Sequence, residues 1–173
     1  SPKGTYAAAT VPRGDKTLLI IIKPGQQEPY GLVNFRESNT HVVNFWWVND
    51  ERILFTVGEK AGGLEQPVSF GEIWGTNADG SKQGLIAGAR SAVTGSRARG
   101  SGTRQAALQM LDSLQNEDDF VLVSTTPFNS GEIPYTSVER MNVYTGTRQP
   151  VTRAPARGAS FTSDQSGKIR FAE

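Results

Sequence analysis

Apolar residues in this chain occur in short runs that are separated by turns rich in Gly, Pro, Asn and Asp. Residues 18–22 are continuously apolar, which predicts a strand that is covered on both faces. Residues 41–58 predict a hairpin that turns at Asn49 and Asp50, because large side chains alternate there with period two. One predicted face carries Val43, Phe45 and Trp47, and the other carries Val42, Asn44, Trp46 and Val48.

The same alternation, bounded by turn residues, predicts the other strands. They cover residues 4–10, 17–23, 72–76, 84–87, 120–125, 137–142, 149–153, 159–162 and 168–172. Residues 88–102 are rich in Gly and Ser and are expected to form a flexible insertion. The spacing of Ala107, Leu108, Leu111 and Leu114 then predicts one short amphipathic helix within residues 103–115.

Two turn elements recur along the chain in a fixed order. The first leads into an extended run and occurs at residues 1–8, 47–55, 116–123 and 162–172. The second falls between these copies, at residues 23–27, 77–83 and 143–149. Recurrence of turn and strand at about 40–50 residues is typical of propeller blades. The predicted fold is therefore all-β: a partial β-propeller of about three to four antiparallel blades, with one short helical insertion.

The repeats divide the chain into successive units. We expect a first blade at 1–37, a second at 38–87, the insertion with its helix at 88–115, a third blade at 116–153 and the start of another at 154–173. The first copy begins at Ser1, within a turn element, and only Glu173 follows the last copy, so we expect an excised or processed segment. Because blade faces would be uncovered, we expect the isolated segment to be oligomeric, prone to aggregation or held by the rest of its chain. A small β-sandwich does not explain the ordered turn elements.

Composition narrows the classes of partner. A net charge of +1 and a pI near 8.0 give no electrostatic case for nucleic acid or an anionic membrane. The absence of cysteine removes disulfides, zinc–thiolate sites and cysteine nucleophiles. The longest apolar run is five residues, which is too short to span a bilayer. No Gly-rich phosphate loop follows a strand, so no cofactor is expected.

The residues needed for nucleophilic catalysis do not occur together in this sequence. No Ser has Gly at both offsets of a nucleophile elbow, and Gly100-Ser101-Gly102 has the wrong spacing. His41 is the single histidine and begins a predicted strand, which favours a structural or surface role over that of a catalytic base. We therefore assign no catalytic residue.

Carboxylates, arginines and aromatic residues each have a plain alternative to a binding role. Glu117, Asp118 and Asp119 fit a solvated turn, and a calcium site would need a Gly that does not follow them. Asp79 with Gly80, and Asp164 with Gly167, are read as turn residues, so no metal site is assigned. Glu51 and Glu139 could each hold the amino terminus of a substrate, but the sequence favours neither of them. A solvated basic loop is the interpretation of Arg90, Arg97, Arg99 and Arg104. The large aromatic side chains form either part of the core or an aromatic pocket; they are Phe45, Trp46, Trp47 and Trp74.

The order of these segments resembles the N-terminal propeller of prolyl oligopeptidase-type serine peptidases, notably bacterial dipeptidyl aminopeptidase and acylaminoacyl-peptidase homologues. The resemblance covers most of residues 40–173 and rests on the segments Trp-Val-Asn-Asp-Glu-Arg-Ile-Leu-Phe, Gly-Glu-Ile-Trp-Gly-Thr-Asn-Ala-Asp-Gly-Ser, Phe-Val-Leu-Val, Val-Tyr-Thr-Gly and Ser-Asp-Gln-Ser-Gly-Lys-Ile-Arg-Phe-Ala. It implies a non-catalytic segment that gates the access of short or N-blocked peptides to an α/β-hydrolase domain absent from this chain.

The alternative is a TolB-like propeller module that binds a protein partner without catalysis. We expect the chain in the periplasm or outside the cell, with the cytoplasm as the alternative location. The expected partners are a hydrolase domain of the same parent chain and a short peptide substrate, with no nucleic acid and no membrane span. Further copies of the chain are expected to associate through exposed blade faces.

Overall fold

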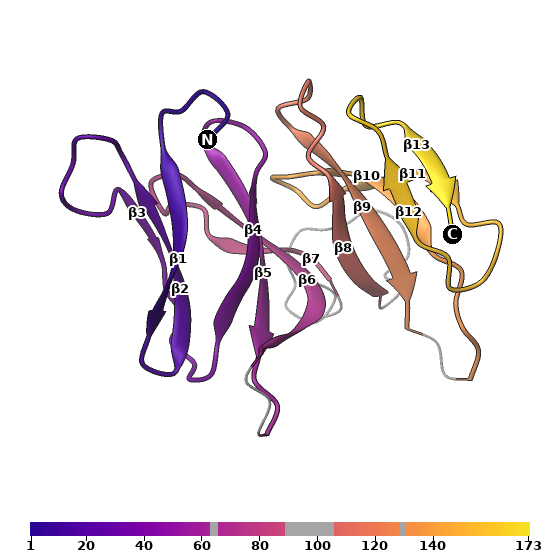
Figure 1. Ribbon diagram of the computed structural model, residues 1–173, viewed down its shortest axis with the longest axis horizontal. Coiled ribbons are helices and arrows are strands. Elements are labelled where there is room, and N and C mark those ends of the chain that lie inside the picture. Colours follow the sequence, from indigo (N-terminus) through magenta and orange to yellow (C-terminus); the bar gives the residue numbers. More distant parts are fainter. Residues whose placement is uncertain (63–65, 89–105, 129–130) are drawn as a thin grey trace. The chain divides into compact units, whose positions relative to one another are not determined.

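The computed structural model describes residues 1–62, 66–88, 106–128 and 131–173 (Figure 1). These residues form strands and no helix, so the fold is all-β as predicted. The strands are β1 (Ala7–Arg13), β2 (Lys16–Ile22), β3 (Gly31–Val33), β4 (His41–Trp47), β5 (Arg52–Glu59), β6 (Val68–Asn77), β7 (Gly84–Ala87), β8 (Ala106–Asp112), β9 (Phe120–Pro127), β10 (Ser137–Asn142), β11 (Arg148–Arg153), β12 (Phe161–Ser163) and β13 (Ile169–Ala172). None of the described residues forms a helix that could cross a membrane.

The strands form three sheets. The first has seven strands in the order β1-β2-β4-β5-β6-β7, with β3 paired to β2, and the second has four in the order β11-β10-β9-β8. The third is the hairpin β12-β13. The chain divides into two compact units, residues 1–70 with 74–84, and residues 71–73 with 85–173. We call them unit 1 and unit 2.

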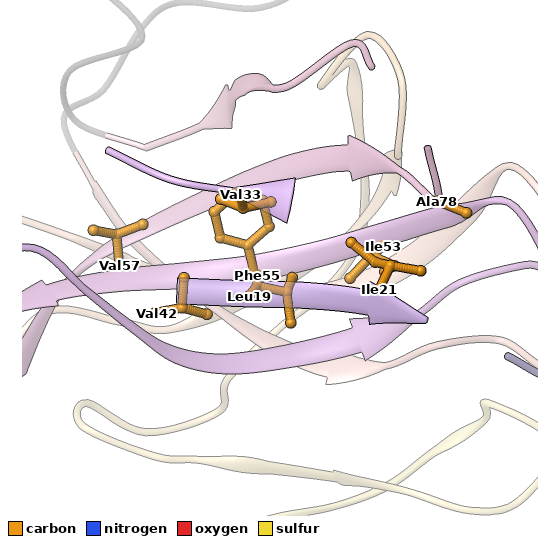
Figure 2. Close-up of a cluster of buried hydrophobic side chains, with 8 residues drawn as sticks. All are labelled: Leu19, Ile21, Val33, Val42, Ile53, Phe55, Val57 and Ala78. Carbon is orange, nitrogen blue, oxygen red and sulfur yellow. The ribbon is translucent and has the colours of Figure 1, made fainter. Parts of the chain in front are cut away.

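The core of unit 1 forms around the continuous apolar run of β2. Leu19 and Ile21 are fully buried, and they gather with side chains of β3, β4 and β5 (Figure 2). The cluster consists of Leu19, Ile21, Val33, Val42, Ile53, Phe55, Val57 and Ala78, and Tyr6, Ala8, Phe35, Phe45, Trp47 and Trp74 pack against it. The aromatic residues Phe45, Trp47 and Trp74 thus serve the core, which was the plainer of the two sequence interpretations, whereas the half-buried Trp46 is not part of this cluster.

The two faces of β4 differ from strict alternation. The register of β4 against β5 shifts between Val42 and Asn44, which leaves Val43 as the additional residue of a β-bulge. A bulge inserts one residue into one strand and exchanges the faces beyond it. Val42 therefore shares the core with Phe45 and Trp47, and the prediction that it lies on the opposite face was wrong.

Unit 2 contains a four-stranded antiparallel sheet in which each strand follows its neighbour in sequence (Figure 1). Its strand β8 corrects the predicted helix, because residues 106–112 pair with β9 from Ala106–Pro127 to Asp112–Leu122. Ala106 and Leu108 are buried while Gln109 is exposed, which is the period of a half-buried strand. Residues 103–105 of the predicted helix lie outside the described residues, as do residues 89–102 of the predicted insertion.

The recurring turn elements occupy equivalent connections in the strand order. The copies at 47–55, 116–123 and 162–172 lead into β5, β9 and β13, and the copy at 1–8 leads into β1. The second element connects β2 to β3, β6 to β7, and β10 to β11. The repeat in the sequence therefore corresponds to a repeat in the order of strands and connections.

Two backbone hydrogen bonds show the same equivalence inside each unit. In unit 1 the Ala78 amide donates to the Glu51 carbonyl at 2.8 Å, and in unit 2 the Val143 amide donates to the Asp119 carbonyl at 2.9 Å. Both donors are buried and both acceptors lie in the first turn element. In each unit this bond ties the second turn element to the first. Four antiparallel strands joined in this way are the pattern of a propeller blade.

Candidate functional site

An open groove of about 620 Å³ lies in unit 2. One side of the groove comes from the β8–β11 sheet, through Leu122, Arg140 and residues 151–153, and the other comes from the β12–β13 hairpin. Its apolar lining residues are Leu114, Leu122, Val151, Pro155, Phe161, Ile169, Phe171 and Ala172. Apolar side chains and charged groups lie side by side on this open groove, which makes it a candidate ligand surface.

The hairpin is held to the sheet by a polar contact at one end of the groove. The Ser163 hydroxyl donates to the Asp112 carboxylate of β8 at 2.7 Å, and the other Asp112 oxygen accepts from the Leu114 amide at 2.8 Å. Asp112 therefore connects β8, the following turn and β12. Leu114, two residues after Asp112, lines the groove.

The turn of the hairpin is organised by Asp164. Its carboxylate accepts hydrogen bonds from the hydroxyl and amide of Ser166, the amide of Lys168 and the guanidinium of Arg170. These donors, Ser166 first, hold the pKa of the Asp164 carboxyl well below its usual range. The structural role that the sequence favoured for Asp164 and Gly167 agrees with this geometry, since Gly167 has a φ of 76° in the same turn.

Cationic side chains line the rim of the groove. Arg140 stacks on the Phe120 ring at 3.4 Å from its centroid and pairs with Glu117. Arg153 lies over the Tyr135 ring at 4.2 Å. In the described part of unit 2, neither Arg153 nor Lys168 forms an ion pair with a carboxylate. These two cations can therefore bind an anionic group from outside.

The adjacent acidic residues Glu117, Asp118 and Asp119 do not form one binding site in the structure. Glu117 pairs with Arg140, and the Asp119 carbonyl accepts the Val143 amide, so these neighbours serve different contacts. In the described residues no group of three His, Asp or Glu side chains is arranged to hold a metal ion. Asp79 accepts from the Ser81 amide at 2.8 Å, as a turn residue does.

The two glutamates considered for a substrate amino terminus lie in different surroundings. Glu139 accepts from the Thr125 hydroxyl at 2.8 Å and pairs with Arg148 at 2.9 Å, so its carboxylate joins β9, β10 and β11. Glu51 lies in the exposed turn before β5, and its backbone carbonyl accepts a hydrogen bond from the Ala78 amide. The structure brings neither one into the groove.

His41 is buried, at 5% exposed, and contacts the Thr17 hydroxyl through Nδ1 at 2.9 Å. Its Nε2 has no hydrogen-bond partner among the described residues. Burial, and to a lesser degree the charge of Lys60, lowers the pKa of the imidazole. His41 is thus placed in the interior of unit 1. Arg90, Arg97, Arg99, Arg104 and Ser101 lie outside the described residues.

Sequence reasoning did not find the buried Arg52. Arg52 is 2% exposed, and its guanidinium donates to the Asn77 side chain at 3.1 Å and to the Lys82 carbonyl at 3.2 Å. Arg52 therefore anchors the second turn element to the start of β5. An Arg directly before the apolar run Ile-Leu-Phe was the signal that was available in the sequence.

No protein-family model matches the sequence, and no curated protein matches it. Among solved structures, the chain is similar to an oligogalacturonate lyase in complex with manganese, with 10% sequence identity and a TM-score of 0.47. The match covers 87% of this chain and spans 33% of that one. A likeness of this size carries over no activity, substrate or metal, and the all-β conclusion comes from the strands described above.

Proposed function

We propose that this chain is the non-catalytic propeller segment of a serine peptidase that acts on short or N-blocked peptides. In this role it gates access to an α/β-hydrolase domain carried outside residues 1–173. The observation that supports the proposal is the equivalence of the turn elements. The segments that resemble prolyl oligopeptidase-type propellers fall at the same connections in successive units, with the same amide-to-carbonyl bond.

Repeated sheets joined by connections of unequal length suit a gate. The recurring turns are short, whereas β9 and β10 are joined by residues 128–136, and Phe128 and Ile133 are 55% and 66% exposed there. Binding residues are commonly carried on such loops above a fixed sheet. Peptide access would then be controlled by loops, while the sheets hold the geometry.

The test is fluorophosphonate labelling of the native gene product, followed by intact mass measurement. The proposal predicts one covalent label on a polypeptide far heavier than the 18.7 kDa of these residues, with the label outside them. Heat-denatured protein is the control, because labelling by an activated Ser requires a folded triad. A folded gene product that takes up no label would contradict the peptidase proposal.

The second candidate is a propeller module that binds a protein partner without catalysis. The open groove of unit 2 favours it, because Phe171 and Val151 remain 66% and 51% exposed on its lining. The labelling experiment separates the two candidates, since only the first requires a reactive Ser in the gene product.

A further inference from the structure

The hairpin of β1 and β2 carries the tripeptide Arg-Gly-Asp at its tip. Arg13 pairs with Lys16 in the register of the two strands, so Gly14 and Asp15 form a two-residue loop. The φ of Gly14 is 61°, whereas the φ of Asp15 is negative. This combination is that of a type II′ turn, which favours Gly at its first central position and matches the twist of a hairpin. The backbone of the tripeptide therefore has one defined conformation.

Both charged side chains of the tip are available to a partner. Arg13, Gly14 and Asp15 are exposed, and Arg13 forms no ion pair with the described residues. The Asp15 carboxylate accepts one hydrogen bond through Oδ2, from the Asn39 amide at 3.2 Å. Its other oxygen accepts none from the described chain. A cation and a carboxylate thus lie on either side of a single glycine.

Contacts with the segment before β4 hold the tip in place. The Lys16 ammonium group donates to the backbone carbonyls of Phe35 and Arg36, both at 3.0 Å. The Thr17 amide donates to the Thr40 carbonyl at 3.2 Å. A loop that is held in one conformation loses less conformational entropy when it binds. The tip is therefore preorganised for recognition, and these contacts all lie within unit 1.

The chemistry of the tip defines the pocket that would bind it. A guanidinium is recognised best by a carboxylate that accepts two N–H hydrogen bonds. A carboxylate with a free oxygen is a ligand for a hard divalent cation such as Mg²⁺. Gly14 has no side chain, and an added Cβ there would meet nothing within 4 Å, so a partner can approach the backbone between the two charges. The complementary pocket holds a divalent cation beside an acidic side chain.

We propose that the tip formed by Arg13, Gly14 and Asp15 binds a receptor protein that has such a pocket. Asp15 completes the coordination of the receptor's cation, and Arg13 pairs with the receptor's carboxylate. Integrins that bind Arg-Gly-Asp peptides are receptors with this chemistry, so one of them serves as the probe. The inference concerns the β1–β2 hairpin alone and does not depend on a hydrolase domain.

The test is the binding of the 173-residue chain to the immobilised ectodomain of an Arg-Gly-Asp-binding integrin, measured by biolayer interferometry in buffer that contains Mg²⁺. We expect saturable binding that is lost in EDTA, because the chelator removes the cation that Asp15 coordinates. The free peptide Gly-Arg-Gly-Asp-Ser should displace the chain. The peptide Gly-Arg-Gly-Glu-Ser should not, since its carboxylate is one methylene further from the backbone.

Variants of the chain locate the site. Asp15→Glu keeps the charge but moves the carboxylate, and it should reduce the affinity by about tenfold or more. Arg13→Gln should also reduce it by about tenfold. Glu28→Asp is the matched control, because Glu28 is exposed in unit 1 and lies outside the tip. It should leave the affinity unchanged. Circular dichroism of each variant establishes that the fold is retained.

Several results would overturn the proposal. These are the absence of saturable binding, binding that persists in EDTA, or equal affinities of Asp15→Glu and the wild-type chain. Equal losses for Asp15→Glu and Glu28→Asp would show that the receptor responds to acidic groups in general. The linear peptide acetyl-Pro-Arg-Gly-Asp-Lys-amide is expected to bind about fivefold more weakly than the chain, because it lacks the hairpin. Equal affinity of this peptide would contradict preorganisation by the turn.

Discussion

At the scale of single residues, His41 makes the stability of unit 1 depend on pH. Its imidazole is buried and its pKa is lowered, so the folded state holds it neutral while the unfolded chain binds a proton below about pH 6.5. The free energy of unfolding is therefore unaffected by His41 above that pH, and it decreases as the pH falls below it. We expect urea unfolding to show a loss of at most about 1.4 kcal/mol per pH unit between pH 7 and 5.

His41→Gln is the control for this loss, because no other histidine is present in the sequence. Carboxyl groups titrate mainly below this window, and the lowered pKa of the Ser1 amine affects both proteins equally. The difference between wild type and variant therefore isolates the imidazole. An identical pH dependence in the two proteins would show that His41 is not buried in its neutral form.

Gly146 tests the second turn element at the same scale. Its φ is 71°, and an added Cβ would fall inside contact distance of the Ile86 carbonyl oxygen, within unit 2. Gly146→Ala should lower the free energy of unfolding by about 2–4 kcal/mol through strain and steric overlap. Gly84→Ala is the control, since a Cβ there meets nothing within 4 Å. Similar denaturation midpoints for both variants would contradict the described turn.

At the scale of elements, the sequence predicted most strands and misassigned one. Residues 137–142 and 84–87 have the predicted bounds because turn residues flank clear runs. Strand β8 was taken for a helix because Ala107, Leu108 and Leu111 fit a helical period, while pairing with β9 selects the strand. Pairing between distant segments is not encoded in a local window. Strand β3 was missed because its three residues carry no period.

A pair of substitutions in β8 distinguishes strand from helix. Leu108 is 2% exposed and Gln109 is exposed, so Leu108→Ala should cost about 2–5 kcal/mol and Gln109→Ala close to nothing. Leu111, which the helix would bury together with Leu108, lies on the partly exposed part of the strand. Chemical denaturation of Leu108→Ala, Gln109→Ala and Leu111→Ala measures these differences in the free energy of unfolding. Equal losses at Leu108 and Leu111 would favour the helix.

At the scale of the whole molecule, the repeat was readable from sequence and the groove was not. The turn elements recur with their own residues, such as Asn77-Ala78-Asp79-Gly80, and each can be recognised locally. The groove instead collects residues from 114 to 172, and its lining depends on how β12 and β13 lie against the β8–β11 sheet. No spacing in the sequence brings Arg153 and Lys168 to one surface. Function therefore had to be proposed from resemblance and geometry together.

The same turn-and-strand repeat occurs in unit 1 and in unit 2, and in each the second turn element donates a backbone hydrogen bond to the first. Amide hydrogen exchange of the isotopically labelled chain, measured by NMR, tests this most directly. Ala78 and Val143 lie outside the strands, but both residues are buried and their amides donate to the carbonyls of Glu51 and Asp119, so both amides should exchange as slowly as the strand amides of Phe55 and Val123. If either exchanges as fast as the amide of the exposed residue Asn116, the turn-and-strand repeat is not the same in unit 1 and unit 2.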